Sequence, residues 1–175
     1  IDSLRRGDRV VPPSLHVAIT DHCFNKCQMC GHWKRPVKWQ HDLEQWLSFL
    51  AKMQKKRLET VCYAGGDPMM HPHLNLIMKW HFEHHLDFGI VTAGYVPSSI
   101  WGSFLARAQW VRLSLDTLDE QAYKVSRGGN ITVSMIMKSI ERMQKYHVNI
   151  QLNLTAHSAN INSLRKVFDL ALEIK

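Results

Sequence analysis

The chain has 175 residues, of which 45% are hydrophobic and 21% are charged, and its formal net charge is +7. This length can bury the core of one domain, and this composition argues against intrinsic disorder. No apolar run approaches the roughly 18 residues that cross a membrane as a helix, so we expect no membrane partner.

Short β-type runs alternate with helical runs along the chain. Branched and aromatic residues in short blocks predict strands, and apolar residues spaced by three or four positions predict helices. The expected strands are 16–20, 60–64, 88–92, 110–115 and 148–154, and the expected helices are 42–56, 74–82, 100–105, 133–143 and a last one from 162 onward. This alternation predicts an α/β fold with a parallel sheet and right-handed crossovers.

Polar and glycine residues follow the expected strands. The carboxyl ends of parallel strands lie at one rim of a sheet, where α/β proteins place their active sites. We therefore expect these residues to meet at one rim: three cysteines after the first strand, then Gly65-Gly66-Asp67-Pro68, Thr92-Ala93-Gly94, Ser114 with Asp116, and Asn153 with Thr155.

Three of the four cysteines lie within eight residues, in the pattern Cys23-x3-Cys27-x2-Cys30. Three thiolates on one short loop can bind three corners of a metal cluster and leave a fourth corner open. The spacing differs from that of the usual four-cysteine iron–sulfur sites and from the paired spacing of zinc ribbons. Cys62 stands alone inside an apolar run, which is typical of a small buried residue.

A rival interpretation is a non-enzymatic module. In it the three cysteines would bind zinc with His22 or His32 as the fourth ligand, or the protein would bind nucleic acid. Zinc modules are usually small and need no sheet of this size. The basic residues are scattered apart from a group at one expected helix end, so nucleic acid is disfavoured as a partner.

The cysteine pattern resembles the signature of the radical S-adenosylmethionine (SAM) superfamily. The resemblance implies that Cys23, Cys27 and Cys30 bind a [4Fe–4S] cluster and that SAM chelates the fourth iron. It also implies a partial (β/α)6 TIM-type barrel, of which about five β-α units are present here. A reduced cluster of this kind cleaves SAM and generates a 5′-deoxyadenosyl radical that abstracts hydrogen from a substrate.

Other segments resemble the same family in the same order. Gly65-Gly66-Asp67-Pro68 is similar to its Gly-Gly-Glu-Pro motif, which binds the SAM amino group, and two glycines let backbone groups approach a ligand closely. The resemblance implies further contacts to the cofactor from Met29, Thr92, Ser114, Arg127 and Asn153.

Three departures from the family pattern stand out. Met29 occupies the position of an aromatic residue that contacts adenine, Asp67 is one methylene shorter than the usual Glu, and Phe24 stands where Asn is common. The residues leave two roles open. Asp116 is either a general base or a structural carboxylate, and Arg127 either pairs with a carboxylate or lies at the surface.

The resemblance covers roughly residues 14 to 173 and gives a full set of expectations. Residues 1–13 would be an N-terminal extension and 14–175 a radical SAM core domain, truncated at its C-terminal end, of a cytoplasmic protein. The enzyme would be an oxidoreductase, transferase or isomerase acting on a small molecule or a peptide, in natural-product, sugar, cofactor or peptide modification. Its electron donor would be a protein such as flavodoxin or ferredoxin.

Overall fold

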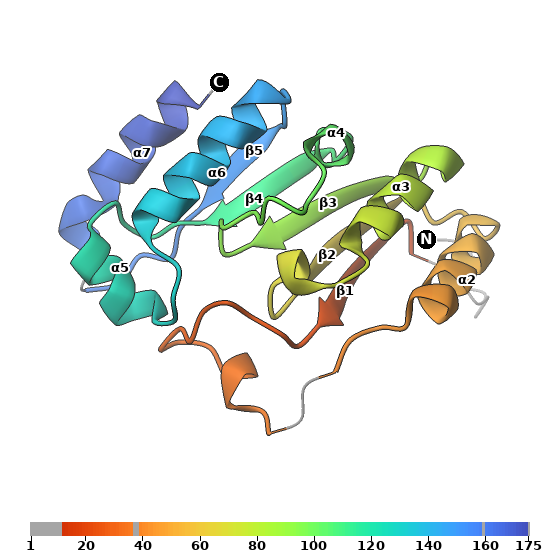
Figure 1. Ribbon diagram of the computed structural model, residues 1–175, viewed down its shortest axis with the longest axis horizontal. Coiled ribbons are helices and arrows are strands. Elements are labelled where there is room, and N and C mark those ends of the chain that lie inside the picture. Colours follow the sequence, from red (N-terminus) through yellow and green to blue (C-terminus); the bar gives the residue numbers. More distant parts are fainter. Residues whose placement is uncertain (1–11, 37–38, 159, 175) are drawn as a thin grey trace, which may run out of the picture.

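Five strands form one parallel sheet in which the spatial order follows the chain order. The computed structural model describes residues 12–36, 39–158 and 160–174 (Figure 1). The strands are β1 Ser14–Thr20, β2 Thr60–Gly65, β3 Asp87–Thr92, β4 Trp110–Ser114 and β5 Ile150–Asn153. The predicted α/β class and parallel sheet are confirmed.

The helices lie on one side of the sheet (Figure 1), where α2 to α6 connect successive strands and α7 follows β5. They are α2 Leu43–Gln54, α3 Leu74–His84, α4 Gly102–Leu105, α5 Glu120–Arg127, α6 Val133–Lys145 and α7 Leu164–Glu173, with short 3-10 turns η1 His32–Lys34, η2 Pro68–Met70 and η3 Ile161–Ser163. Side chains of Asp42, Asp119 and Thr132 cap the first turns of α2, α5 and α6. No helix among the described residues has the length and apolar character to span a membrane.

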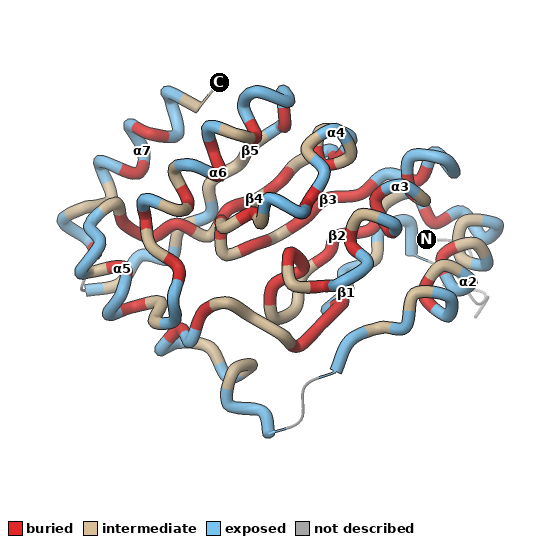
Figure 2. Tube along the Cα trace, viewed as in Figure 1, coloured by how far each residue is buried: buried red, intermediate tan, exposed pale blue. Residues whose placement is uncertain are grey.

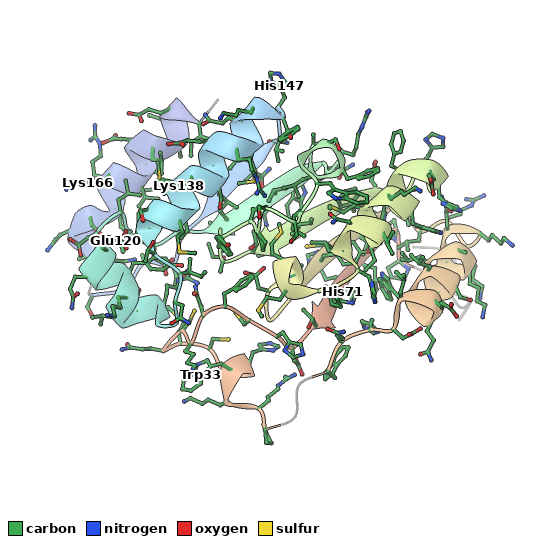
Figure 3. All side chains as sticks on the ribbon, viewed as in Figure 1. Trp33, His71, Glu120, Lys138, His147 and Lys166 are labelled. Carbon is green, nitrogen blue, oxygen red and sulfur yellow. The ribbon has the colours of Figure 1, made fainter. Side chains whose placement is uncertain are left out.

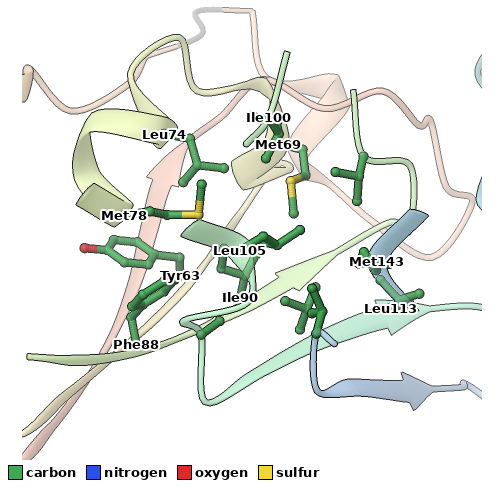
Figure 4. Packing of buried hydrophobic residues seen from close by; sticks show 14 of the residues in the cluster. Tyr63, Met69, Leu74, Met78, Phe88, Ile90, Ile100, Leu105, Leu113 and Met143 are labelled. Carbon is green, nitrogen blue, oxygen red and sulfur yellow. The ribbon is translucent and has the colours of Figure 1, made fainter. Parts of the chain in front are cut away.

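Alternation along the strands divides the sheet into a packed face and an inner face. Tyr63, Ile90 and Leu113 are fully buried on the packed face, where they meet apolar side chains of the helices, among them Met78 and Met143 (Figure 4). The alternate positions form the inner face, which includes His16, Ala18, Cys62, Ala64, Val91, Arg112, Ser114, Gln151 and Asn153. Several of these are half-buried or exposed, as the burial trace in Figure 2 illustrates.

A buried polar group ties α3 to the sheet within this core. Nδ1 of His81 lies 2.8 Å from the carbonyl oxygen of Leu86, which can only accept, so Nδ1 carries the proton. Nε2 of His81 then accepts from the hydroxyl of Tyr63 at 2.6 Å, and that hydroxyl accepts from Nε1 of Trp46 at 3.1 Å. The imidazole is satisfied only while it is neutral, and burial lowers the pKa of His81 to about 4.

We expect the protein to lose stability as the pH falls from the unfolded-state pKa of about 6.5 through the folded-state pKa of His81. His81→Gln keeps an acceptor for Tyr63 but does not titrate. Between about pH 7.5 and pH 5, the free energy of unfolding should fall by about 2 kcal/mol more in the wild type than in the variant. Urea denaturation at the two pH values measures this difference, and equal losses in the two proteins would contradict the assignment.

Candidate active site

The cysteine loop, residues 21–36, leaves the carboxyl end of β1 and runs along one edge of the molecule (Figure 1). Cys27 is buried and Cys23 and Cys30 are half-buried, and all three are free thiols. A tight turn joins two of them, because the amide of Cys30 donates to the carbonyl of Cys27 at 3.1 Å. The indole of Trp33, labelled in Figure 3, donates to the same carbonyl at 2.9 Å.

Burial opposes ionisation of the Cys23 and Cys27 thiols. Burial raises the pKa of Cys23 to about 11, and the neighbouring Asp67, Cys27 and Cys30 add to the effect as like charges. Burial also raises the pKa of Cys27, against the favourable charge of Arg127. A bound cation would reverse this balance, since metal coordination deprotonates thiols.

The spacing of the thiols bears on the kind of metal group they could hold. Within the described ranges, no three His, Cys, Asp or Glu side chains are grouped as a single metal ion would require. An iron–sulfur cluster has a different requirement, because each thiolate binds its own iron atom. His32, a candidate zinc ligand, lies with Nδ1 3.3 Å from Oδ1 of Asp21. Three thiols on one loop supply the ligands that an iron–sulfur cluster needs, one thiolate for each of three irons.

The turn after β2 holds the first half of the cysteine loop. The amide of Gly66 donates to the carbonyl of Thr20 at 2.7 Å, and the amide of Asp67 donates to the carbonyl of His22 at 2.6 Å. A Cβ added at Gly66 would lie 2.1 Å from the carbonyl oxygen of His22. The close approach that requires this glycine is thus an approach to the backbone of the cysteine loop.

The C-terminus of α5 holds the second half of the loop. The amides of Lys26 and Gln28 donate to the carbonyls of Arg127 and Ser126 at 2.9 and 3.0 Å. The chain then turns at two glycines with positive φ, and a Cβ at Gly129 would lie 2.4 Å from the carbonyl oxygen of Phe24. Sequence reasoning missed α5, although Asp119 in the N-cap position was a usable signal.

Asp67 is fully buried and links the ends of β2 and β3. Its carboxylate accepts from the amides of Met69 and Ala93, each at 3.0 Å, and from the hydroxyl of Thr92 at 2.8 Å. Burial raises the pKa of Asp67 to about 6, against the effect of these hydrogen bonds. The carboxylate of Asp67, which is one methylene shorter than the usual Glu, is therefore hydrogen-bonded to other groups of the protein, and Thr92 is its side-chain partner.

Arg127 and Asp116 form a buried ion pair beside the cysteines. Nε and Nη2 of Arg127 each lie 2.6 Å from Oδ2 of Asp116, whose Oδ1 accepts from the amide of Thr155 at 2.8 Å. Nη1 of Arg127 lies 3.9 Å from Sγ of Cys27. Arg127 is thus paired with a carboxylate of its own chain, and Asp116 is held by this ion pair and by the Thr155 amide.

Met29, in the cysteine loop, lines a cavity of about 410 Å³. Val125 and Ser126 of α5 line it, together with Thr155 and His157 after β5. Nε2 of His157 is buried and has no hydrogen-bond partner among the described residues, which marks a position where a ligand could supply one. Sequence reasoning did not select His157; its place after the fifth strand was the only available signal.

The remaining predicted residues divide into two groups. Ser114 and Asn153 are paired across the last residues of β4 and β5, at the same rim as the cysteine loop. Gly65 has a φ of 122° and Pro68 is buried at the start of η2, so both shape the turn after β2. Cys62 lies within β2, apart from the cysteine loop.

We expect Gly66→Ala to displace the cysteine loop and to reduce the iron content of the reconstituted protein by about half or more, because the new methyl group meets the His22 carbonyl. Gly31→Ala is a matched control on the loop itself, since a Cβ there has no neighbour within 4 Å. Iron per chain after anaerobic reconstitution measures the effect, and equal iron content in the two variants would refute it.

Comparison with known proteins connects this geometry to a family. The sequence model described as Radical SAM superfamily matches residues 17–171. The chain is 24% identical over 140 residues to an S-adenosylmethionine-dependent nucleotide dehydratase from Thermoplasmatales archaeon (strain ISO4-H5), covering 77% of this chain and 47% of that protein. It is 26% identical over 148 residues to a GTP 3′,8-cyclase from Aliarcobacter butzleri (strain RM4018), covering 79% and 45%. The chain thus spans about half the length of these curated relatives.

Solved structures agree on the fold. Streptococcus suis SuiB bound to S-adenosylmethionine superposes with a TM-score of 0.83 at 18% identity, over 99% of this chain and 41% of that chain. The anSMEcpe enzyme with bound AdoMet and a peptide superposes with a TM-score of 0.72 at 19% identity, over 91% and 47%. These matches confirm the predicted partial barrel. With the family match across most of its length, the chain belongs to the radical SAM superfamily.

Proposed function

We propose that this protein binds a [4Fe–4S] cluster through Cys23, Cys27 and Cys30 and cleaves SAM reductively to start a radical reaction on its substrate. The observation that supports this most strongly is the loop itself: three free thiols held between the turn after β2 and the end of α5. When bound, such a cluster supplies an electron and an open iron site, which together split SAM into methionine and a 5′-deoxyadenosyl radical.

The residues around the loop would hold the thiolates in place. Trp33 fixes the carbonyl of Cys27, and Arg127 sets a positive charge beside its sulfur. Because Asp116 fixes two nitrogens of Arg127, the guanidinium cannot turn away from the loop. The charge of Arg127 favours the deprotonated sulfur that metal binding requires, and the Trp33 hydrogen bond holds the backbone that carries it.

The same rim offers groups for SAM. We assign backbone groups at Gly65, Gly66 and Pro68 to the amino acid part of the cofactor. Ser114, Asn153 and Arg127 would contact its polar groups from the ends of β4, β5 and α5. Met29 and the cavity that it shares with His157 have the apolar surface and the unpaired nitrogen that an adenine ring would use. Asp67 and Thr92 would act indirectly, by holding the turn after β2.

For the substrate we favour a small molecule. The two curated relatives described above are named for reactions of nucleotides, whereas SuiB has been solved with its precursor peptide SuiA. An oxidoreductase, transferase or isomerase reaction would suit the same site. A small electron-transfer protein such as flavodoxin or ferredoxin would reduce the cluster. A cytoplasmic location would suit the free thiols, because that compartment keeps cysteines reduced.

Formation of 5′-deoxyadenosine tests this function. The reconstituted protein, incubated with SAM and dithionite without oxygen, should produce it in a cluster-dependent way. Cys27→Ala should produce none, and Cys62→Ala should match the wild type, since Cys62 lies in β2 away from the loop. Absence of 5′-deoxyadenosine from an iron-loaded wild-type protein would overturn the proposal.

Iron content gives a separate prediction. The wild type should bind about four iron atoms per chain after reconstitution. Each of Cys23→Ala, Cys27→Ala and Cys30→Ala should lower this number substantially, because each thiolate would bind one iron, while Cys62→Ala should leave it unchanged. Colorimetric iron and sulfide assays measure it, and full iron content in Cys27→Ala would sink the assignment of the three ligands.

A further inference from the structure

The middle row of the inner face has alanine on two strands, valine on the third and a cation on the fourth. Strand register places Ala18 beside Ala64, Val91 beside Arg112, and Arg112 beside Gln151. Inner layers of closed barrels are usually filled by bulky branched side chains. Two of the three side chains beside Arg112 are alanines, which are smaller than these. Ala18 is exposed and Ala64, Val91 and Arg112 are half-buried, so solvent reaches this row.

Arg112 is held in a fixed position within this row. Its Nε and Nη2 donate to Oε1 of Gln151 at 3.2 and 2.9 Å, and its guanidinium lies 4.4 Å from the centre of the Trp110 ring. The ring in turn lies on Gly89 of β3, where a Cβ would come within 2.5 Å of the indole. Gly89, the Trp110 ring and the Gln151 amide thus hold the Arg112 guanidinium in one position without a bound ligand.

No described carboxylate neutralises this cation. Arg127 is paired with Asp116, whereas Arg112 forms no ion pair with any Asp or Glu in the described ranges. Its Nη1 has no hydrogen-bond partner among these residues either. Its charge reaches across β3: burial raises the pKa of Cys62 in β2, and Arg112 opposes that rise. A half-buried, unpaired guanidinium with free donors is suited to an oxyanion.

We infer that Arg112 and Gln151 form a binding site for a phosphate group of the substrate, which would therefore be a phosphorylated small molecule. Arg112 lies two residues before Ser114 on the same face of β4, so the phosphate would be held roughly 7 Å below the rim that carries the cysteine loop. The remainder of the substrate would extend from there toward the rim. The assignment of this phosphate to a substrate rests on the proposed function, but binding of an anion at the site can be tested without catalysis.

Binding of inorganic tripolyphosphate and of GTP to the reconstituted protein tests the site by calorimetry. The wild type should bind both, more weakly as salt rises. Arg112→Gln should weaken binding by roughly tenfold to a hundredfold, as expected for loss of hydrogen bonds from a charged donor. Arg107→Gln is a matched control, because Arg107 also stacks on an aromatic ring, 4.8 Å from the centre of Phe82, and its loss changes the net charge equally.

A second variant distinguishes loss of the binding site from loss of the fold. Gln151→Glu keeps Arg112 in place but pairs it with a carboxylate, so it should abolish tripolyphosphate binding in a folded protein. SAM affinity should stay unchanged in both variants, since the proposed ligand is the substrate. Failure of SAM cleavage with anion binding intact would remove the proposed function and leave the phosphate site standing.

Four results would overturn the inference. The first is a wild-type protein that binds neither tripolyphosphate nor GTP, and the second is Arg112→Gln binding as tightly as Arg107→Gln. The third is a parallel loss of SAM affinity in Arg112→Gln, which would assign the guanidinium to the SAM carboxylate. The fourth is an acidic peptide that binds more tightly than tripolyphosphate and is lost in the same variant.

Discussion

Four backbone hydrogen bonds hold the cysteine loop, and the candidate site depends on them. Their donors are the amides of Gly66, Asp67, Lys26 and Gln28, and each joins the loop or its approach from β1 to the turn after β2 or to the end of α5. Apart from the short η1, the loop has no regular structure of its own. Two rigid neighbours therefore position three thiols before any metal is bound, as a preorganised ligand set requires.

Buried aspartates after three strands extend this arrangement across the rim. Asp21 follows β1 and accepts from Arg35 at 2.9 Å, which closes the far end of the cysteine loop. Asp67 follows β2 and ties it to β3, and Asp116 follows β4 and joins Arg127 to the segment after β5. Each carboxylate accepts hydrogen bonds at the rim. Arg112, which forms no ion pair within the described part of the chain, lies one layer lower on the inner face.

The sequence predicted the elements that carry a strong local pattern. Alternating or clustered apolar residues located all five strands, and cysteine spacing located the loop. Contacts between residues distant in sequence could not be predicted. No residue near Gly66 indicates that the carbonyl of His22 is its neighbour. No residue near Arg127 indicates that it contacts Asp116 and Cys27. The helix α5 was missed because its eight residues are mostly polar and only Tyr123 and Ser126 are buried.

If Cys23, Cys27 and Cys30 bind three irons of a [4Fe–4S] cluster, the fourth iron stays open to SAM. Electron paramagnetic resonance of the reconstituted, reduced protein, recorded with and without SAM, tests it most directly. We predict the signal of a reduced [4Fe–4S] cluster whose g-values shift when SAM is added, because SAM would become a ligand of the fourth iron. A cluster signal that saturating SAM leaves unchanged, or a colourless protein that holds one zinc ion, would contradict the account.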